Sequence, residues 1–223
     1  MGFIKRNVLR KGGLYMSEYT EEYVAEMKRF NQNGKILVFG SFDHEMGAYA
    51  PEQVQEAVAA AQRLGRDHVV LIFDSRGGDL HASQRFLGAM HMFRPSADFK
   101  FVGYVAVQAA SAAFVLLQHC DWRVAHVDAA LLVHYGTTTL GVMDAALVHT
   151  GAAHALRYER LRNQEMIDFF AQRSGKCTAQ QVHTLCKADL PLTPSQCLEY
   201  GFLDEVSANV PPVSVRPNYA IHD

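Results

Sequence analysis

The alternation of apolar runs and amphipathic stretches along the chain predicts an α/β fold. KILVFG from Lys35, HVVLIFDS from His68 and FKFVGYVAV from Phe99 have the length and composition of buried strands. Between them lie PEQVQEAVAAAQRLG and LHASQRFLGAMHMF, whose apolar residues recur with helical spacing. Near-continuous apolar strands that alternate with helices are typical of a mostly parallel sheet flanked by helices.

Turn and capping residues give the expected ends of the helices. The helix after the first strand is predicted to begin at Pro51, because proline fits the first helical turn. A proline-free pattern over residues 142–174 predicts a helix of roughly 45–50 Å, which would project from a compact domain towards another subunit. Two short helices are predicted after the capping residues Thr178 and Thr193, and FLDEV from Phe202 is the last expected strand.

The composition is that of one globular domain. The 223 residues, 49% of them hydrophobic, suffice for a substantial core. We expect a partly disordered arm over residues 1–33, a domain over 34–206 and a tail over 207–223. The net charge of −2 argues against a nucleic-acid partner, and no apolar stretch reaches the roughly 20 residues of a membrane-spanning helix. Without the apolar segment of a secretory signal, the chain is expected to be soluble and cytoplasmic.

Cysteines and acidic clusters give little support for a metal or a cofactor. None of the four cysteines forms a C-x-x-C pair, which favours free thiols in a reducing compartment. In SFDHEMG, the side chains of Asp43, His44 and Glu45 are potential metal ligands, but a plain polar loop is the favoured interpretation. We therefore predict no metal site and no cofactor held by this chain.

Two candidate features follow predicted strands, at the edge where parallel sheets bind ligands. In DSRGGD, the pair Gly77-Gly78 leaves backbone N–H groups uncovered, which suits an oxyanion or a phosphate, although its spacing is not that of a P-loop. In VQAASAAFVLL, Ser111 follows a strand and begins a helix, where the helix dipole stabilises developing negative charge. The alternative interpretation of Ser111 is a serine that only caps this helix.

His134 is a third candidate, at the end of the apolar run ALLVHYG. A serine nucleophile needs a base within hydrogen-bond reach, and the base needs an orienting carboxylate. The alternative is a histidine satisfied at the end of an edge strand. Spacing alone does not choose among the possible carboxylates, which are Asp121, Asp128, Asp144 and Asp189.

Taken in order, these segments resemble a known family. DSRGGDLHAS, QAASAAFVLL, LLVHYG and DLPLTPSQCLEYGFLDEV are similar to the proteolytic subunit of the Clp protease, over roughly Lys35 to Val206. The resemblance implies that Ser111 is the nucleophile, His134 the base and Asp189 the acid of a catalytic triad.

The resemblance also implies roles for backbone and loop residues. The N–H groups of Gly78 and Ala112 would form the oxyanion hole, and Gly77, Arg76 and Tyr135 are candidate substrate-binding residues. Arg76 stands where the family has a proline, and Ala112 stands where it usually has a methionine. A backbone donor does not depend on its side chain, so these departures leave the oxyanion hole possible.

For the whole molecule, the resemblance implies a fold of the ClpP/crotonase type, with repeated ββα units and a long protruding handle helix in the 142–174 segment. It implies an ATP-dependent serine endopeptidase that acts on peptides or unfolded proteins inside a chamber of stacked homo-oligomeric rings. A partner Clp-type ATPase would use the ATP, so the chain itself would need no cofactor, nucleic acid or membrane.

Two other functions stay open. The first is a catalytically idle ring subunit that scaffolds or regulates an active peptidase, which Arg76 and the atypical first 33 residues motivate. The second is an acyl-CoA enzyme of the crotonase type, which would use carboxylates in place of a serine–histidine pair. No suitable glutamate lies beside the glycine or alanine loop.

Overall fold

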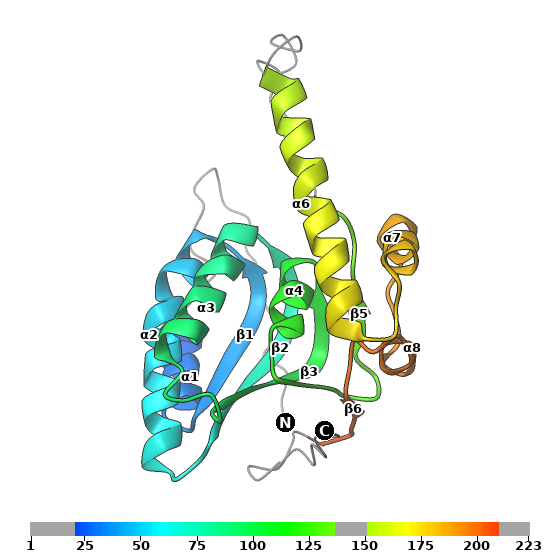
Figure 1. Ribbon diagram of the computed structural model, residues 1–223. Helices are drawn as coiled ribbons and strands as arrows, with labels where there is room; N and C mark the ends of the chain where they lie inside the picture. Colours follow the sequence, from blue (N-terminus) through cyan, green and yellow to red (C-terminus); the bar gives the residue numbers. More distant parts are fainter. Residues whose placement is uncertain (1–20, 137–150, 210–223) are drawn as a thin grey trace.

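The structure is a computed structural model that describes residues 21–136 and 151–209. Its centre is a parallel sheet with the strand order β1-β2-β3-β4-β6, and β5 pairs with the end of β3 (Figure 1). The predicted mixed α/β fold with a parallel sheet is therefore confirmed. The strands are β1 (Lys35–Phe42), β2 (His68–Gly78), β3 (Lys100–Ala110), β4 (Trp122–Ala125), β5 (Ala130–Leu132) and β6 (Glu205–Val206). The helices are α1 (Glu21–Asn31), α2 (His44–Arg63), α3 (Leu80–Phe93), α4 (Ala112–Gln118), α6 (Gly151–Ser174), α7 (Ala179–Ala188) and α8 (Pro194–Tyr200).

The structure does not confirm the repeated ββα units that the resemblance implies. In the described residues, each of β1, β2 and β3 is followed directly by one helix. On one side β3 pairs with β2, and on the other it pairs with β4 at residues 102–105 and with β5 at residues 108–110. The carboxyl end of β3, which leads into Ser111, therefore lies between β2 and β5.

The helix that we predicted to begin at Pro51 begins earlier, at His44, so this prediction is wrong. The reason is Asp43, whose carboxylate accepts a hydrogen bond from the Met46 N–H at 2.8 Å and caps the helix. Pro51 therefore lies inside α2, where its missing N–H leaves the Gly47 carbonyl without its helical donor.

Across residues 21–136 and 151–209, no three His, Cys, Asp or Glu side chains are grouped so that they could hold a metal ion.

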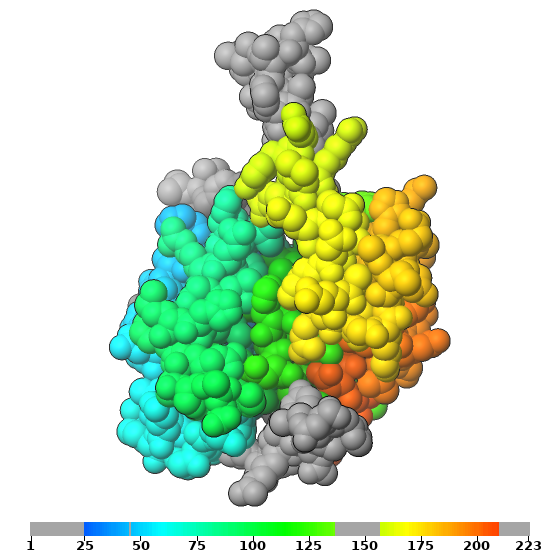
Figure 2. All heavy atoms as spheres, viewed as in Figure 1, coloured from blue at the N-terminus to red at the C-terminus, as the bar shows by residue number. Residues whose placement is uncertain are grey.

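The helix α6 extends away from the rest of the molecule (Figures 1 and 2). It covers Gly151–Ser174 of the predicted 142–174, and the earlier residues of that prediction lie outside the described part of the chain. Tyr158 and Leu161 on this helix are 60% and 57% exposed. None of the helices that the structure describes is both long enough and apolar enough to span a membrane.

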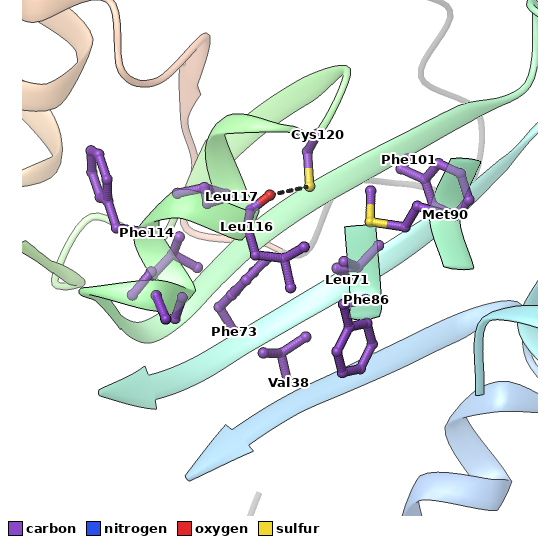
Figure 3. Packing of buried hydrophobic residues seen from close by; sticks show 14 of the residues in the cluster. Val38, Leu71, Phe73, Phe86, Met90, Phe101, Phe114, Leu116, Leu117 and Cys120 are labelled. Carbon is purple, nitrogen blue, oxygen red and sulfur yellow. Dashed lines mark hydrogen bonds between the residues drawn. The ribbon is translucent and has the colours of Figure 1, made fainter. Parts of the chain in front are cut away.

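A continuous apolar core fills the space between the sheet and the helices α2, α3, α4 and α6. Figure 3 shows side chains of β1 and β2 pointing towards those of α3 and α4. Phe114 of α4 is fully buried and makes edge-to-face contacts with Phe170 of α6 and with Phe202, with ring centroids 5.4 Å apart in both pairs. Burial of such a side chain contributes about 1.5–3 kcal/mol. These contacts fix α4, and with it Ser111 at its start.

A buried polar network fastens the other end of α4. The Arg123 guanidinium donates to the Asp204 carboxylate at 2.7 and 2.9 Å, and to the side-chain oxygen of Gln118 at 2.7 Å. The side-chain amide of Gln118 in turn donates to the Phe202 backbone carbonyl. The backbone carbonyl of Gln118 accepts a hydrogen bond from the Arg173 side chain of α6. The network therefore joins α4, β4, α6 and the segment before β6.

We predict that Asp204→Ala lowers the free energy of unfolding by about 3–5 kcal/mol, because it leaves the Arg123 charge buried without its partner. Urea denaturation followed by circular dichroism measures this. The exposed Asp98 is the matched control, and Asp98→Ala should change the free energy by less than about 0.5 kcal/mol. Equal losses in the two variants would contradict a structural role for the network.

Candidate active site

Ser111 lies in a strained turn between β3 and α4. Its backbone angles are φ 55° and ψ −125°, and its N–H donates to the Leu132 carbonyl of β5 at 3.0 Å. Only two non-glycine residues in the described part of the chain have a positive φ, and the other is Asp189. Such strain persists only where the surrounding structure imposes it, and it is concentrated at functional sites.

Gly77 at the end of β2 shows how the turn is imposed. A side chain at Gly77 would collide with the Ala110 carbonyl oxygen, and its Cβ would lie only 2.7 Å from the Ala112 nitrogen. The backbones of β2 and of the Ser111 turn are therefore packed directly against each other. Gly77 itself has a φ of +83°, which favours glycine.

The glycine loop is in turn fixed by Ser75, a fully buried side chain of β2. Its hydroxyl donates to the Gly40 carbonyl of β1 at 2.7 Å and accepts from the Gly77 N–H at 3.1 Å. The loop therefore cannot shift without breaking bonds to the neighbouring strand. Arg76, between these two residues, is exposed.

The hydroxyl of Ser111 does not cap α4. Ser111 is the residue before the first helical turn, but its side chain makes no capping hydrogen bond. The interpretation of Ser111 as a helix cap is therefore wrong. The threonines Thr178 and Thr193 behave differently, since each caps its helix as predicted and accepts a backbone N–H at 3.2 Å. Both caps are capping boxes in the structure.

His134 and Asp189 lie beside each other because of one backbone bridge. Leu131 of β5 and Leu192 exchange two hydrogen bonds in an antiparallel pair. This bridge lies three residues before His134 and three residues after Asp189, so it holds the two segments together close to both residues. The His134 Nδ1 is 3.4 Å from the Asp189 Oδ1, and these side chains are 27% and 63% exposed.

The other carboxylates considered from the sequence have different surroundings. Asp121 pairs with Arg94 and accepts the Phe101 N–H. Asp128 lies 3.7 Å from His126, and Asp144 is outside the described residues.

Ser111 and His134 are near each other without being bonded. β3 and β5 pair in parallel up to Ala110 and Leu132, so Ser111 and His134 follow the ends of neighbouring strands. No hydrogen bond between the Ser111 hydroxyl and His134 occurs in the part of the chain that the structure describes. Catalytic hydrogen bonds are often long without substrate and tighten when it binds.

The two residues after His134 are held by side chains that the sequence did not suggest. The Tyr135 hydroxyl lies 2.6 Å from the His183 Nδ1 of α7, and the Gly136 N–H donates to Asn163 of α6 at 2.8 Å. Burial raises the pKa of Tyr135, and the nearby Cys186 raises it further by a smaller amount, so the Tyr135 hydroxyl stays protonated. No sequence motif marks His183 or Asn163, because both act through contacts distant in the chain.

The two backbone groups expected to bind an oxyanion lie near Ser111. The Ala112 N–H belongs to the first residue of α4 and so has no partner within the helix. The N–H of Asp79, next to Gly78, donates to the Phe42 carbonyl of β1 at 2.9 Å, so the glycine loop is bonded to β1 directly after Gly78.

Fold and site together define a class, an α/β protein in which one edge of a parallel sheet gathers a serine, a histidine and an aspartate. A family model described as Clp protease matches residues 18–210, most of the chain. The chain therefore belongs to the Clp protease family, and this membership supports a peptidase, the class of hydrolase expected from the sequence. A search of curated proteins finds no match.

We predict that Gly77→Ala lowers the free energy of unfolding by about 2–4 kcal/mol, through collision with the Ser111 turn and an unfavourable φ. Gly65→Ala separates the two causes, because Gly65 has a φ of +67° and open space around it. Its loss should be about 1 kcal/mol. Urea denaturation measures both, and equal losses would contradict the close packing of the two backbones.

Proposed function

We propose that this protein is a serine endopeptidase with Ser111 as nucleophile, His134 as base and Asp189 as acid. The observation that carries the proposal is the pairing of the His134 Nδ1 with Asp189 next to a serine in a strained turn. Membership of the Clp protease family supports the same reaction class. An uncapped hydroxyl on Ser111 is consistent with a nucleophile, since capping would occupy it.

The proposed reaction follows from which nitrogen of His134 is free. Because Nδ1 faces Asp189, Nε2 accepts the Ser111 proton as the hydroxyl oxygen attacks the peptide carbonyl. Asp189 stabilises the resulting imidazolium. His134 then gives the proton to the leaving amine, which leaves an acyl group on Ser111 that water hydrolyses in the same way.

Negative charge develops on the carbonyl oxygen during the attack, and two backbone donors are suited to stabilise it. We assign these to the N–H groups of Gly78, in the glycine loop, and of Ala112, the first residue of α4. The substrate would contact Gly77 and the exposed Arg76 on the glycine loop, with Tyr135 beside the base.

The proposed enzyme is a homo-oligomer of stacked rings in the cytoplasm, fed with unfolded chains by a Clp-type ATPase that uses the ATP. Its support in the structure is α6, which extends from the body and exposes Tyr158 and Leu161 (Figure 1). Large apolar side chains on a projecting helix favour contact with a second copy of the chain.

One observation favours a second function, an idle subunit that supports an active peptidase. It is the missing hydrogen bond between the Ser111 hydroxyl and His134 within the described residues. In this alternative, Ser111→Ala would leave the activity of a mixed ring unchanged.

Labelling with a fluorophosphonate probe, followed by peptide mass spectrometry of the full chain, tests the proposed function. We expect the adduct on Ser111, no adduct in Ser111→Ala, and unchanged labelling in the control Ser96→Ala, which changes an exposed serine. Asp189→Asn should lower the hydrolysis rate by about 10⁴-fold, because it favours the wrong histidine tautomer. A folded, assembled protein that stays unlabelled on Ser111 would exclude the peptidase and favour the idle subunit.

The assembly has its own test. We predict that Leu161→Glu lowers the native mass of the assembly, since it puts a charge into the proposed contact on α6. The control is Leu64→Glu, at a 50% exposed leucine next to α2. Native mass spectrometry that finds the same mass for both variants and the wild type would contradict an interface at this part of α6.

A further inference from the structure

We propose that Tyr135 and His183 form a clamp that positions the carboxylate of Asp189 against His134. The clamp rests on the proposed function, because it acts through two of the residues assigned to the triad. Tyr135 and His183 are therefore positioning residues, and neither exchanges a proton with the substrate.

The side chains of Tyr135 and His183 are in direct contact. The Tyr135 hydroxyl is 2.6 Å from the His183 Nδ1 and 3.2 Å from the His183 backbone oxygen. Both contacts are hydrogen bonds at once when Nδ1–H donates to the phenol oxygen and the phenol O–H donates to the carbonyl. The rings also meet edge to face, with centroids 5.7 Å apart. One tyrosine thus holds both the side chain and the backbone of α7.

The helix α7 contacts the core through one side, where Ala179 and Leu185 are partly buried and pack against it. Of the residues in this helix, only Val182 and Cys186 are buried. Asp189 is its C-terminal cap, with a φ of 49°, and its side chain is 63% exposed. Because this carboxylate is mostly exposed, close packing does not orient it, and its direction depends on the position of α7.

The clamp lies next to the proposed base in the sequence. Tyr135 directly follows His134, and His183 precedes Asp189 on the same short helix. The bond between Tyr135 and His183 therefore adds a second link, besides the bridge between Leu131 and Leu192, between the backbones that bear the base and the acid. On the other side, Gly136 is bonded to Asn163 of α6, so α6 and α7 hold successive residues after His134.

The His134 Nδ1 and the Asp189 Oδ1 are 3.4 Å apart, which is an ion-pair distance beyond the roughly 2.7–3.2 Å of an N–H···O hydrogen bond. A small movement of α7 decides whether the two atoms come within hydrogen-bond distance. Loss of about 1 Å of alignment in an active site costs up to about 100-fold in rate. The clamp supplies the constraint that the exposed Asp189 lacks.

The test measures the second-order rate of Ser111 labelling by a fluorophosphonate on the full, assembled chain. Tyr135→Phe and His183→Ala should each lower this rate by about 10-fold. His183→Asn keeps a polar group close to the position of the His183 Nδ1 and should restore the rate to within about twofold of the wild type. Tyr49→Phe, at an exposed tyrosine of α2, is the matched control and should label at the wild-type rate.

A double-mutant cycle separates positioning from a general loss of structure. In an Asp189→Asn background, His183→Ala should change the labelling rate by less than about twofold, because the group that the clamp positions is already altered. With a fluorogenic N-acyl peptide amide, His183→Ala should lower kcat and leave KM unchanged, because His183 is not among the residues assigned to substrate binding. Urea denaturation checks folding, and the exposed His183 provides a variant that folds even if Tyr135→Phe does not.

The outcomes distinguish the clamp from the proposed function. Wild-type labelling on Ser111 with unchanged rates in folded His183→Ala would overturn the clamp alone. Equal rate losses from His183→Ala with and without Asp189→Asn would also overturn it, since His183 would then act independently of the acid. A wild-type protein unlabelled on Ser111 would overturn the proposed function, and the clamp with it.

Discussion

The direct packing of two backbones, at Gly77 and at the turn around Ser111, is the constraint on which the candidate site depends. Because no side chain fits between them, the end of β2 presses against the turn and holds Ser111 at a φ of 55°. Ser75 holds the glycine loop from beneath, and the buried Phe114 holds the helix that follows. A strained serine is therefore kept in place by contacts that have no role in the proposed chemistry.

The remaining parts of the site reach this turn through the sheet. β5 pairs with the last residues of β3 and so delivers His134 to the serine, while the bridge between Leu131 and Leu192 delivers Asp189 to the histidine. The three proposed catalytic residues come from segments far apart in the chain. Parallel pairing of β3 and β5 brings Ser111 and His134 to one edge of the sheet, and the antiparallel bridge adds Asp189. Because Asp189 is the C-terminal cap of α7, the position of this helix affects the geometry of the site.

Much of this could be predicted from the sequence, because apolar runs and glycine loops are local signals. The strands, the capping boxes and the loop at Gly77 are predicted by such patterns, whereas the start of α2 was missed because the Asp43 cap outweighed Pro51. Spacing alone left four carboxylates open beside His134, and only the resemblance singled out Asp189. The bond between Tyr135 and His183 could not be predicted, since it depends on how α7 packs against a distant strand end.

A crystal structure of the full chain with a phosphonate bound covalently to Ser111 tests the central claim most directly. The account predicts the phosphoryl oxygen within about 2.7–3.1 Å of the Gly78 and Ala112 nitrogens. It also predicts the His134 Nε2 next to the Ser111 oxygen, with Asp189 still paired to Nδ1. A phosphonate whose oxygen points to solvent, with His134 turned away from Ser111, would contradict the account.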